Sequence, residues 1–160
     1  MSVSSETFRE VLGKFATGVT IVTLTNREGS HGLTVNAFSS VSLEPPLVLI
    51  CIQKNGTSHS ALAETNHFVV NILSADQREL ADRFADSNLS SAERFRGIRY
   101  QLSAIGIPIL GDTLGHLECK IVNEINAGDH TIFLGRADHA EVHDGNLAPL
   151  LFYGSRYHRL

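Results

Sequence analysis

The chain has 160 residues, 42% of them hydrophobic, so a single domain over residues 1–160 can bury a core without disulfides or a metal. Thirteen basic and seventeen acidic side chains give a net charge of −4, which argues against nucleic acid and anionic membranes as partners. The sequence also lacks a signal-peptide pattern, a membrane-length apolar run and C-x-x-C spacing between its two cysteines, so we expect a cytoplasmic protein with free thiols.

The chain begins with a predicted helix, for which Ser4 or Ser5 is the candidate cap. Its apolar residues recur at positions i, i+3, i+4 and i+7, a spacing that gathers them on one helical face: Phe8, Val11, Leu12 and Phe15. We expect this face to pack on a sheet, and Gly18 to end the segment.

Strands are predicted next. Residues 19–24 and 31–38 are rich in β-branched and apolar side chains on either side of a turn, which predicts a hairpin. Pro45 and Pro46 then interrupt the chain, because a central strand does not tolerate proline. The continuous apolar run Leu47–Ile52 predicts a strand buried on both faces.

Two helices are predicted around a further strand. Thr57 or Ser58 can cap the first helix, and residues 67–73 read as a strand. Ser74 and Gln77 have the spacing of a capping box, which predicts the start of the second helix.

The C-terminal half is predicted to be mostly β-structure. Residues 86–97 are typical of an exposed loop, and 106–115 of irregular chain with a proline turn. Two long alternating runs, 117–125 and 131–142, predict an antiparallel hairpin, and 150–153 a last strand. Strands thus outnumber helices and follow one another through tight turns, so the predicted fold is mainly β, an antiparallel barrel with a few flanking helices.

No glycine-rich phosphate loop of the Rossmann or P-loop type is present. Hydroxyl groups are instead concentrated in residues 34–42, and Lys54, Thr57 and Ser58 form a second polar cluster before a predicted helix. Hydroxyls, backbone N–H groups and a cation are what a phosphate needs, so the two clusters are candidates to hold one phosphate between them. Strand propensity and turn chemistry alone also explain these residue types.

Four motifs together resemble the short-chain flavin reductases, in that family's order and over nearly the whole chain. They are residues 15–23 (FATGVTIVT), 31–49 (HGLTVNAFSSVSLEPPLVL), 68–73 (FVVNIL) and 127–135 (AGDHTIFLG). The resemblance implies a Greek-key-like split β-barrel homodimer that reduces FMN or FAD with NADH or NADPH. It also implies a partner, a flavin-dependent monooxygenase component that receives the reduced flavin.

The resemblance further implies a flavin site. The segment along the ring and ribityl chain would be Thr34, Val35, Asn36 and Ala37. The residues that flank the phosphate would be Ser40, Ser42, Lys54 and Ser58. The residues that meet the flavin from the following strand would be Cys51, Ile52 and Gln53.

The same resemblance places His130 near the nicotinamide, as the candidate catalytic residue, and lets Tyr153 and Tyr157 close the site. Arg83 and Phe84 are candidates to reach an FAD adenine or the dinucleotide. In this reaction the protein mainly has to position the two rings and needs little acid–base chemistry, because the hydride passes directly from nicotinamide C4 to flavin N5. Without the motif, a histidine beside a turn reads as a solvated residue.

Alternative functions remain open at this point. The same barrel can serve as an electron carrier with tightly bound FMN and no nicotinamide turnover, or as an oxidase of the pyridoxamine-phosphate type. A Ser-His-Asp hydrolase has little support, because G-x-S-x-G is absent. The sequence does not separate FMN from FAD or NADH from NADPH.

Three histidines are candidates for a metal site. His139 and His143 can share one strand face, and His116 can approach from the partner strand. Because Asp138, Glu141 and Asp144 lie beside them, a solvated, charged strand end is the favoured interpretation, with no metal.

Overall fold

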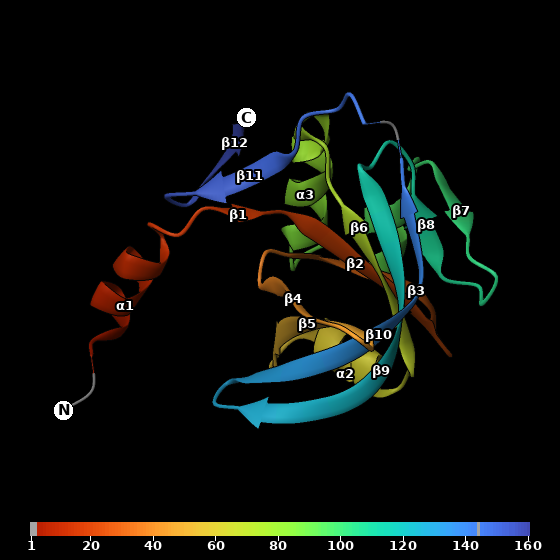
Figure 1. Cartoon of the computed structure of the whole chain (residues 1–160), viewed down its shortest axis with the longest axis horizontal. Helices are drawn as coiled ribbons and strands as arrows, with labels where there is room; N and C mark the ends of the chain where they lie inside the picture. The colour runs from red at the N-terminus through yellow and green to blue at the C-terminus, as the bar shows by residue number, and fades with distance from the viewer. Residues whose placement is uncertain (1–2, 144) are drawn as a thin grey trace.

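The computed structural model describes residues 3–143 and 145–160, and within them β-structure dominates (Figure 1). Seven strands form one sheet in which every neighbouring pair is antiparallel. Their order is β3 (Gly29–Val35), β2 (Thr20–Asn26), β6 (His67–Ile72), β9 (Gly115–Ala127), β10 (His130–Val142), β5 (Pro46–Gln53) and β4 (Phe38–Leu43). The edge strands β3 and β4 are consecutive in the chain but not hydrogen-bonded to each other, which leaves the barrel split.

The inner face of the curled sheet holds the main core. Alternating side chains from β2, β3, β5, β6, β9 and β10 meet there, and α2 (Thr57–Ala63) adds the buried Ala61 and Leu62. Gly135 marks the tightest contact, because a Cβ at this position would stand 2.6 Å from Phe68 Cζ and 3.1 Å from Cys119 Cβ. The register of β9 and β10 shifts at this glycine, which lets the hairpin bend over Phe68.

Two helices cover part of the outer face. The turn η1 (Ala75–Gln77) has the predicted capping box and leads into α3 (Arg78–Ala85), whose Ala81 and Phe84 are buried against β2 and β3. Phe84 packs directly on Gly32, where no side chain would fit. The short helix α4 (Ser91–Phe95) follows and also contacts β3.

Two smaller sheets complete the described structure. β1 (Thr17–Gly18) pairs with β11 (Leu150–Tyr153), which pairs with β12 (Arg156–Arg159). β7 (Tyr100–Leu102) and β8 (Pro108–Leu110) form a hairpin over the outer side of β6, where Val69 packs with Ile107 and Ile109. In the described residues, no helix is long and apolar enough to cross a membrane.

The predicted fold class, a mainly β antiparallel split barrel with few helices, is confirmed. The capping box, the long hairpin and the strand at 150–153 are confirmed too. The loop predicted at 86–97 is wrong in part, because Ser90 and Glu93 form a capping box that starts α4. The irregular chain predicted at 106–115 contains β8, and α2 is capped by Gly56 rather than Thr57 or Ser58.

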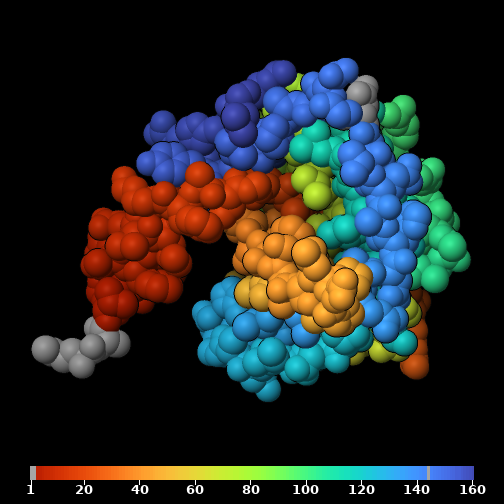
Figure 2. All heavy atoms as spheres, in the orientation of Figure 1, coloured from red at the N-terminus to blue at the C-terminus, as the bar shows by residue number. Residues whose placement is uncertain are grey.

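The first helix, α1 (Ser5–Leu12), forms with Ser4 as cap, but its predicted packing on a sheet is wrong. None of its residues is buried, and it projects away from the barrel (Figures 1 and 2). It ends at Gly13, before the predicted Gly18. The side chains of Val11 and Phe15 are 64% and 74% exposed.

The strand β5 is also not buried on both faces as predicted. Val48, Ile50 and Ile52 are buried in the core, whereas Leu47, Leu49 and Cys51 alternate with them and are half-buried. The continuous apolar run therefore serves two different surfaces: the inner face fills the barrel, and the outer face lines an open cavity.

Candidate functional site

A cavity of about 560 Å³ lies outside the barrel, between α1, the β3–β4 connection, β5 and the turn after β11. Its lining includes Arg9, Phe15, Asn36, Leu49, Cys51 and Tyr153. Figure 2 shows the hollow between the projecting α1 and the barrel. This volume lies within the range of ordinary ligand and cofactor sites, roughly 300–1,000 Å³.

Alternate side chains of β5 form one wall of this cavity. Leu49, Cys51 and Gln53 follow one another on the outer face of β5. Opposite Gln53 on β10 stands His130, and opposite Cys51 stands Ile132. Because directly paired residues project on the same side of a sheet, His130 belongs to the face that lines the cavity.

The predicted flavin segment divides into two pairs. Asn36 and Ala37 connect β3 to β4 and line the cavity, and Cys51 N donates to Ala37 O at 3.0 Å, which fixes the connection against β5. Thr34 instead donates to Ala81 O at 2.6 Å, beneath α3. Val35 is 5% exposed and points into the core.

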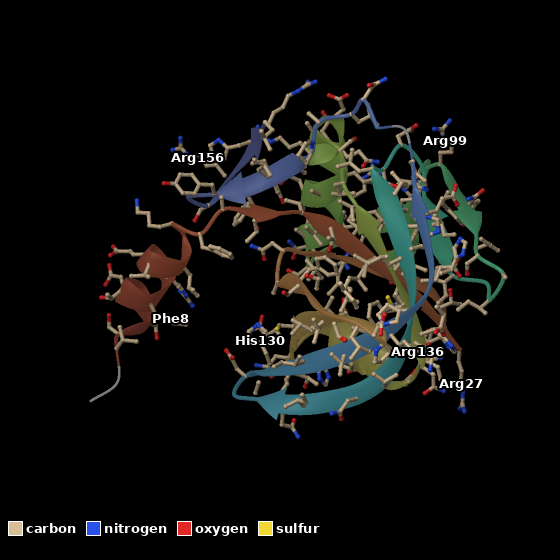
Figure 3. All side chains as sticks on the ribbon, viewed as in Figure 1. Phe8, Arg27, Arg99, His130, Arg136 and Arg156 are labelled. Atoms are coloured by element: carbon tan, nitrogen blue, oxygen red, sulfur yellow. The ribbon has the colours of Figure 1, made fainter. Side chains whose placement is uncertain are left out.

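The turn that carries His130 is tied to the end of β5. Lys54 Nζ donates to Gly128 O at 2.7 Å, and Lys54 N donates to Asp129 O at 2.9 Å. His130 Nδ1 donates to the Asp129 carboxylate at 2.7 Å, and this hydrogen bond lowers the pKa of Asp129. The arrangement fixes the tautomer of a neutral His130 and turns its other nitrogen, Nε2, away from Asp129. Figure 3 shows His130 near the tip of the β9–β10 hairpin and Phe8 on α1, on opposite sides of the open space in this view.

The predicted phosphate residues do not converge on one point. Ser40 and Ser42 lie on the edge strand β4 and border a separate groove with Leu47 and Ala137. Since Ser42 pairs with Leu47, it stands about seven residues along β5 from Lys54, on the order of 20 Å. A single phosphate cannot touch both Ser42 and Lys54. Ser58 is half-buried on α2.

The remaining candidates occupy different surroundings. Ile52 is 4% exposed within the core, and Phe84 is 1% exposed under α3. Arg83 Nη1 donates to Arg96 O at 2.9 Å beside a polar crevice. Tyr157 packs on Phe152, and burial raises its pKa, whereas Tyr153 lines the cavity.

Several lining residues were not anticipated from the sequence: Arg9, Leu12, Phe15, Phe38, Leu49 and Phe152. For α1, the signal is its amphipathic spacing, which predicts a face packed on a sheet and does not distinguish it from a face that lines a cavity. For Leu49, the signal was its place two residues from Cys51 on the same strand face.

The residues present fit a flavin. The cavity walls offer apolar side chains for a planar ring, with Leu49 and Cys51 on one side and Phe15 and Phe152 on others. Arg9 supplies the positive charge that a phosphate requires. The fold and this site define a split β-barrel with a nucleotide-sized cavity on its outer surface.

Comparison with known proteins agrees with this class. Residues 12–160 match the family described as flavin reductase like domain. FMN reductase (NADH) SmoA of Agrobacterium fabrum is 42% identical over 98% of this chain and 86% of its own length. Reductase subunit HsaB of a Mycobacterium tuberculosis flavin-dependent monooxygenase is 34% identical over 97% of this chain and 82% of its own.

Solved structures show the same similarity. The Streptomyces globisporus NADH:FAD oxidoreductase in complex with NAD and FAD fragments has a TM-score of 0.90 and 38% identity, covering 100% of this chain and 96% of that one. The flavin reductase PheA2 in its native state has a TM-score of 0.89 and 37% identity, over 99% of each chain. The chain therefore belongs to the flavin reductase-like domain family, as its motifs indicated.

Proposed function

We propose that this protein is an NAD(P)H-dependent flavin reductase that transfers a hydride from NADH or NADPH to FMN or FAD. The observation that carries the proposal is the open cavity, bounded by Asn36, Ala37 and Cys51, in a chain whose relatives are named NADH-dependent flavin reductases. The monooxygenase reductase components among these relatives support a partner monooxygenase that uses the reduced flavin.

The two bound substrates would supply the redox chemistry themselves, since nicotinamide C4 donates a hydride and flavin N5 accepts it. The chain's own contribution is to hold two planar rings face to face at roughly 3–3.5 Å. Leu49 and Cys51 offer an apolar wall, and the carbonyl of Ala37 is already used by Cys51 N, which keeps the Asn36–Ala37 connection in place.

His130 is proposed to bind the nicotinamide nucleotide. Its Nδ1 is committed to Asp129, so Nε2 is the nitrogen available for a ligand. Its side chain is 42% exposed, which leaves it accessible from solvent. The tie between Lys54 and Gly128 holds this turn beside the end of β5.

We propose roles in flavin binding for the other predicted residues according to their surroundings. Thr34, Val35, Ile52 and Phe84 are engaged in packing or hydrogen bonds, so any contact with flavin would run through their backbone or through the elements they position. The polar and aromatic residues with accessible side chains are proposed to contact phosphate, ribityl or adenine groups directly: Ser40, Ser42, Gln53, Lys54, Ser58, Arg83, Tyr153 and Tyr157.

A homodimer of single-domain chains is also proposed. No residue of α1 is buried in the described part of the chain, and three of its apolar side chains, Phe8, Val11 and Leu12, are 52%, 64% and 52% exposed. An exposed apolar face of this kind is typical of an interaction surface, and we propose that a second copy of the chain covers it. Sedimentation velocity should give a dimer for the wild type and for Glu10→Ala, and a monomer for Val11→Glu; a monomeric wild type would contradict the proposal.

A cytoplasmic location is proposed on the basis of the two free thiols, Cys51 and Cys119. Thiols persist in a reducing compartment.

One anaerobic assay tests the activity. Purified protein is mixed with NADH or NADPH and an excess of FMN, FAD or riboflavin, and flavin absorbance is followed. Bleaching over many turnovers is the expected result. Reduction limited to one bound equivalent would instead indicate an electron carrier, and oxidation of a pyridoxamine substrate would indicate the oxidase.

A further inference from the structure

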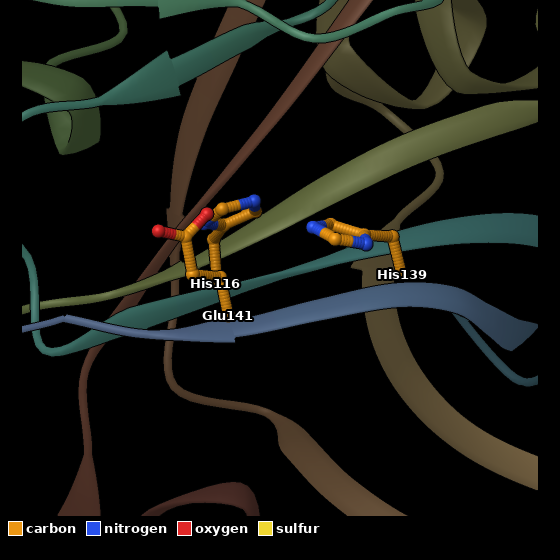
Figure 4. Close-up of side chains that lie close together, drawn as sticks. All are labelled: His116, His139 and Glu141. Atoms are coloured by element: carbon orange, nitrogen blue, oxygen red, sulfur yellow. The ribbon is translucent and has the colours of Figure 1, made fainter.

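Four side chains with metal-binding groups share one patch on the outer face of the β9–β10 hairpin. His116 pairs directly with Glu141, and Glu118 pairs directly with His139. Residues two apart on a strand project on the same side, so the four form a square of two imidazoles and two carboxylates. Figure 4 shows His139 and Glu141 approaching the ring of His116.

His116 is not the solvated residue that the sequence predicted. It is 2% exposed, because β8 lies over this side of the sheet: Asn71, which pairs with His116, accepts a hydrogen bond from Leu110 N at 2.9 Å. The interpretation of a solvated strand end is therefore wrong for His116.

One nitrogen of this buried ring has no hydrogen-bond partner among residues 3–143 and 145–160. His116 Nδ1 lies 3.0 Å from His143 Nε2, whereas His116 Nε2 is buried and unpaired within that part of the chain. Glu118 Oε1 lies 3.8 Å from His116 Nε2, which is too long for a hydrogen bond. A buried polar atom without a partner is unusual and calls for a ligand or an ion.

The surroundings of His116 match those of a metal-binding histidine. His143 Nδ1 lies 2.9 Å from Thr113 Oγ1 and 3.2 Å from Thr113 O, so His143 can donate to that carbonyl and accept the Nδ1 proton of His116 at its own Nε2. In this arrangement His116 Nε2 carries the lone pair and is the nitrogen left for a ligand. Metal-bound histidines are commonly held through their other nitrogen in this way.

We propose that His116, His139 and Glu141 bind a divalent metal ion, Zn²⁺, and that a carboxylate oxygen of Glu118 is the fourth ligand. One ligand atom of each of the first three residues lies within 4.8 Å of the others. Ligand atoms around one Zn²⁺ stand about 3.4 Å apart at bond lengths near 2.1 Å, and His139 and Glu141 are exposed side chains that can rotate to close the difference.

The site is separate from the flavin cavity. None of the four residues lines that cavity, and they occupy the opposite half of the hairpin from His130. Zn²⁺ has no redox chemistry, so it is compatible with a protein that handles reduced flavin. The ion would join β9 to β10 beside the register shift between Ala137 and His139, where the ladder is interrupted.

The test is a titration of untagged, chelator-treated protein with Zn²⁺ in competition with a chromophoric chelator. One equivalent per chain should bind, and Zn²⁺ should raise the melting temperature. The exposed variants His139→Ala and Glu141→Gln should each weaken binding by about tenfold or more and lose the thermal shift. The matched controls His158→Ala and Glu124→Gln, on exposed strand positions elsewhere, should bind as the wild type does.

Co²⁺ used in place of Zn²⁺ gives a second readout. A visible absorption band should appear in the wild type and decrease in His139→Ala. The proposal is overturned if the wild type binds no stoichiometric Zn²⁺, or if His139→Ala and Glu141→Gln bind as tightly as the controls. Either result would leave the flavin reductase assay unaffected.

Discussion

The two faces of the β5–β10 strand pair share the apolar run of β5 and have different roles. The inner face carries Val48, Ile50 and Phe133, all buried in the barrel core. The outer face carries Leu49, Cys51 and His130, of which the first two line the cavity. Successive side chains of a strand point to opposite faces, so one pair of strands provides a packing face and a ligand-contact face.

This separation means that the two faces tolerate change differently. An inner substitution has to be accommodated by close-packed neighbours, so its effect appears in folding stability. An outer substitution meets open space, so its effect appears in ligand binding. Phe133 and Ile132, and likewise Cys119 and Cys51, allow a buried and an outer position to be compared directly.

The largest expected effect is on stability. Phe133 is 0% exposed, and Phe133→Ala should lower the free energy of unfolding by about 3–5 kcal/mol through lost burial and a residual cavity. Its neighbour on the outer face, Ile132→Ala, should cost about 1 kcal/mol. Urea denaturation with equal m-values measures both. Equal losses from the two variants would show that the faces are not distinct.

The second-largest expected effect is a difference in reactivity between the two thiols. Burial, helped by the charges of Asp138 and Glu118, raises the pKa of Cys119 from 9.0 to about 12, which reduces its thiolate about a thousandfold at any pH below 9. Burial also raises the pKa of Cys51, but this thiol lines the cavity. Iodoacetamide should therefore modify Cys51 alone in the native protein. At pH values below the pKa of Cys51, the rate should increase about tenfold for each unit by which the pH is raised, because the thiolate fraction increases by that factor.

Mass spectrometry of tryptic peptides distinguishes the two sites. Added FMN should protect Cys51, since flavin is proposed to occupy the same cavity. Modification of Cys119 at a comparable rate, or no protection by any flavin, would contradict the assignment of faces.

A bulky residue on the outer face should block the cavity without unfolding the chain. Cys51→Trp should lower kcat/KM for flavin at least about tenfold, or about 1.4 kcal/mol. Val122→Trp, at a strand position that is 46% exposed and outside the cavity lining, is the matched control and should keep wild-type kinetics. Unchanged flavin kinetics in Cys51→Trp would place the flavin elsewhere.

The sequence predicted the inner face well and the outer face poorly, for a physical reason. Alternation and β-branched residues determine strands, so the long hairpin and the barrel class followed from local patterns. The apolar run at Leu47–Ile52 looks the same whether its outer side chains meet a core or a ligand. The apolar stripe of α1 is equally ambiguous, because spacing does not say which surface covers it.

Contacts between distant segments were not predictable from local patterns either. The burial of His116 depends on β8, which comes from residues that read as irregular chain, and on the β6–β9 register. The role of His130 was predicted from its motif and stays a prediction, and the structure adds its Asp129 partner and its place on the outer face.

The smallest expected effect concerns His130. His130→Ala removes one proposed contact to the nicotinamide nucleotide, so KM for NADH should rise roughly three- to tenfold while KM for flavin stays the same, because a hydrogen bond of this kind contributes about 0.5–1.5 kcal/mol. Asp129→Asn should give a smaller rise, since the imidazole remains but loses the carboxylate that orients it. The matched control is His158→Ala, an exposed histidine on β12. An unchanged KM for NADH and an unchanged kcat in His130→Ala would restrict the functional part of the outer face to β5 and the β3–β4 connection.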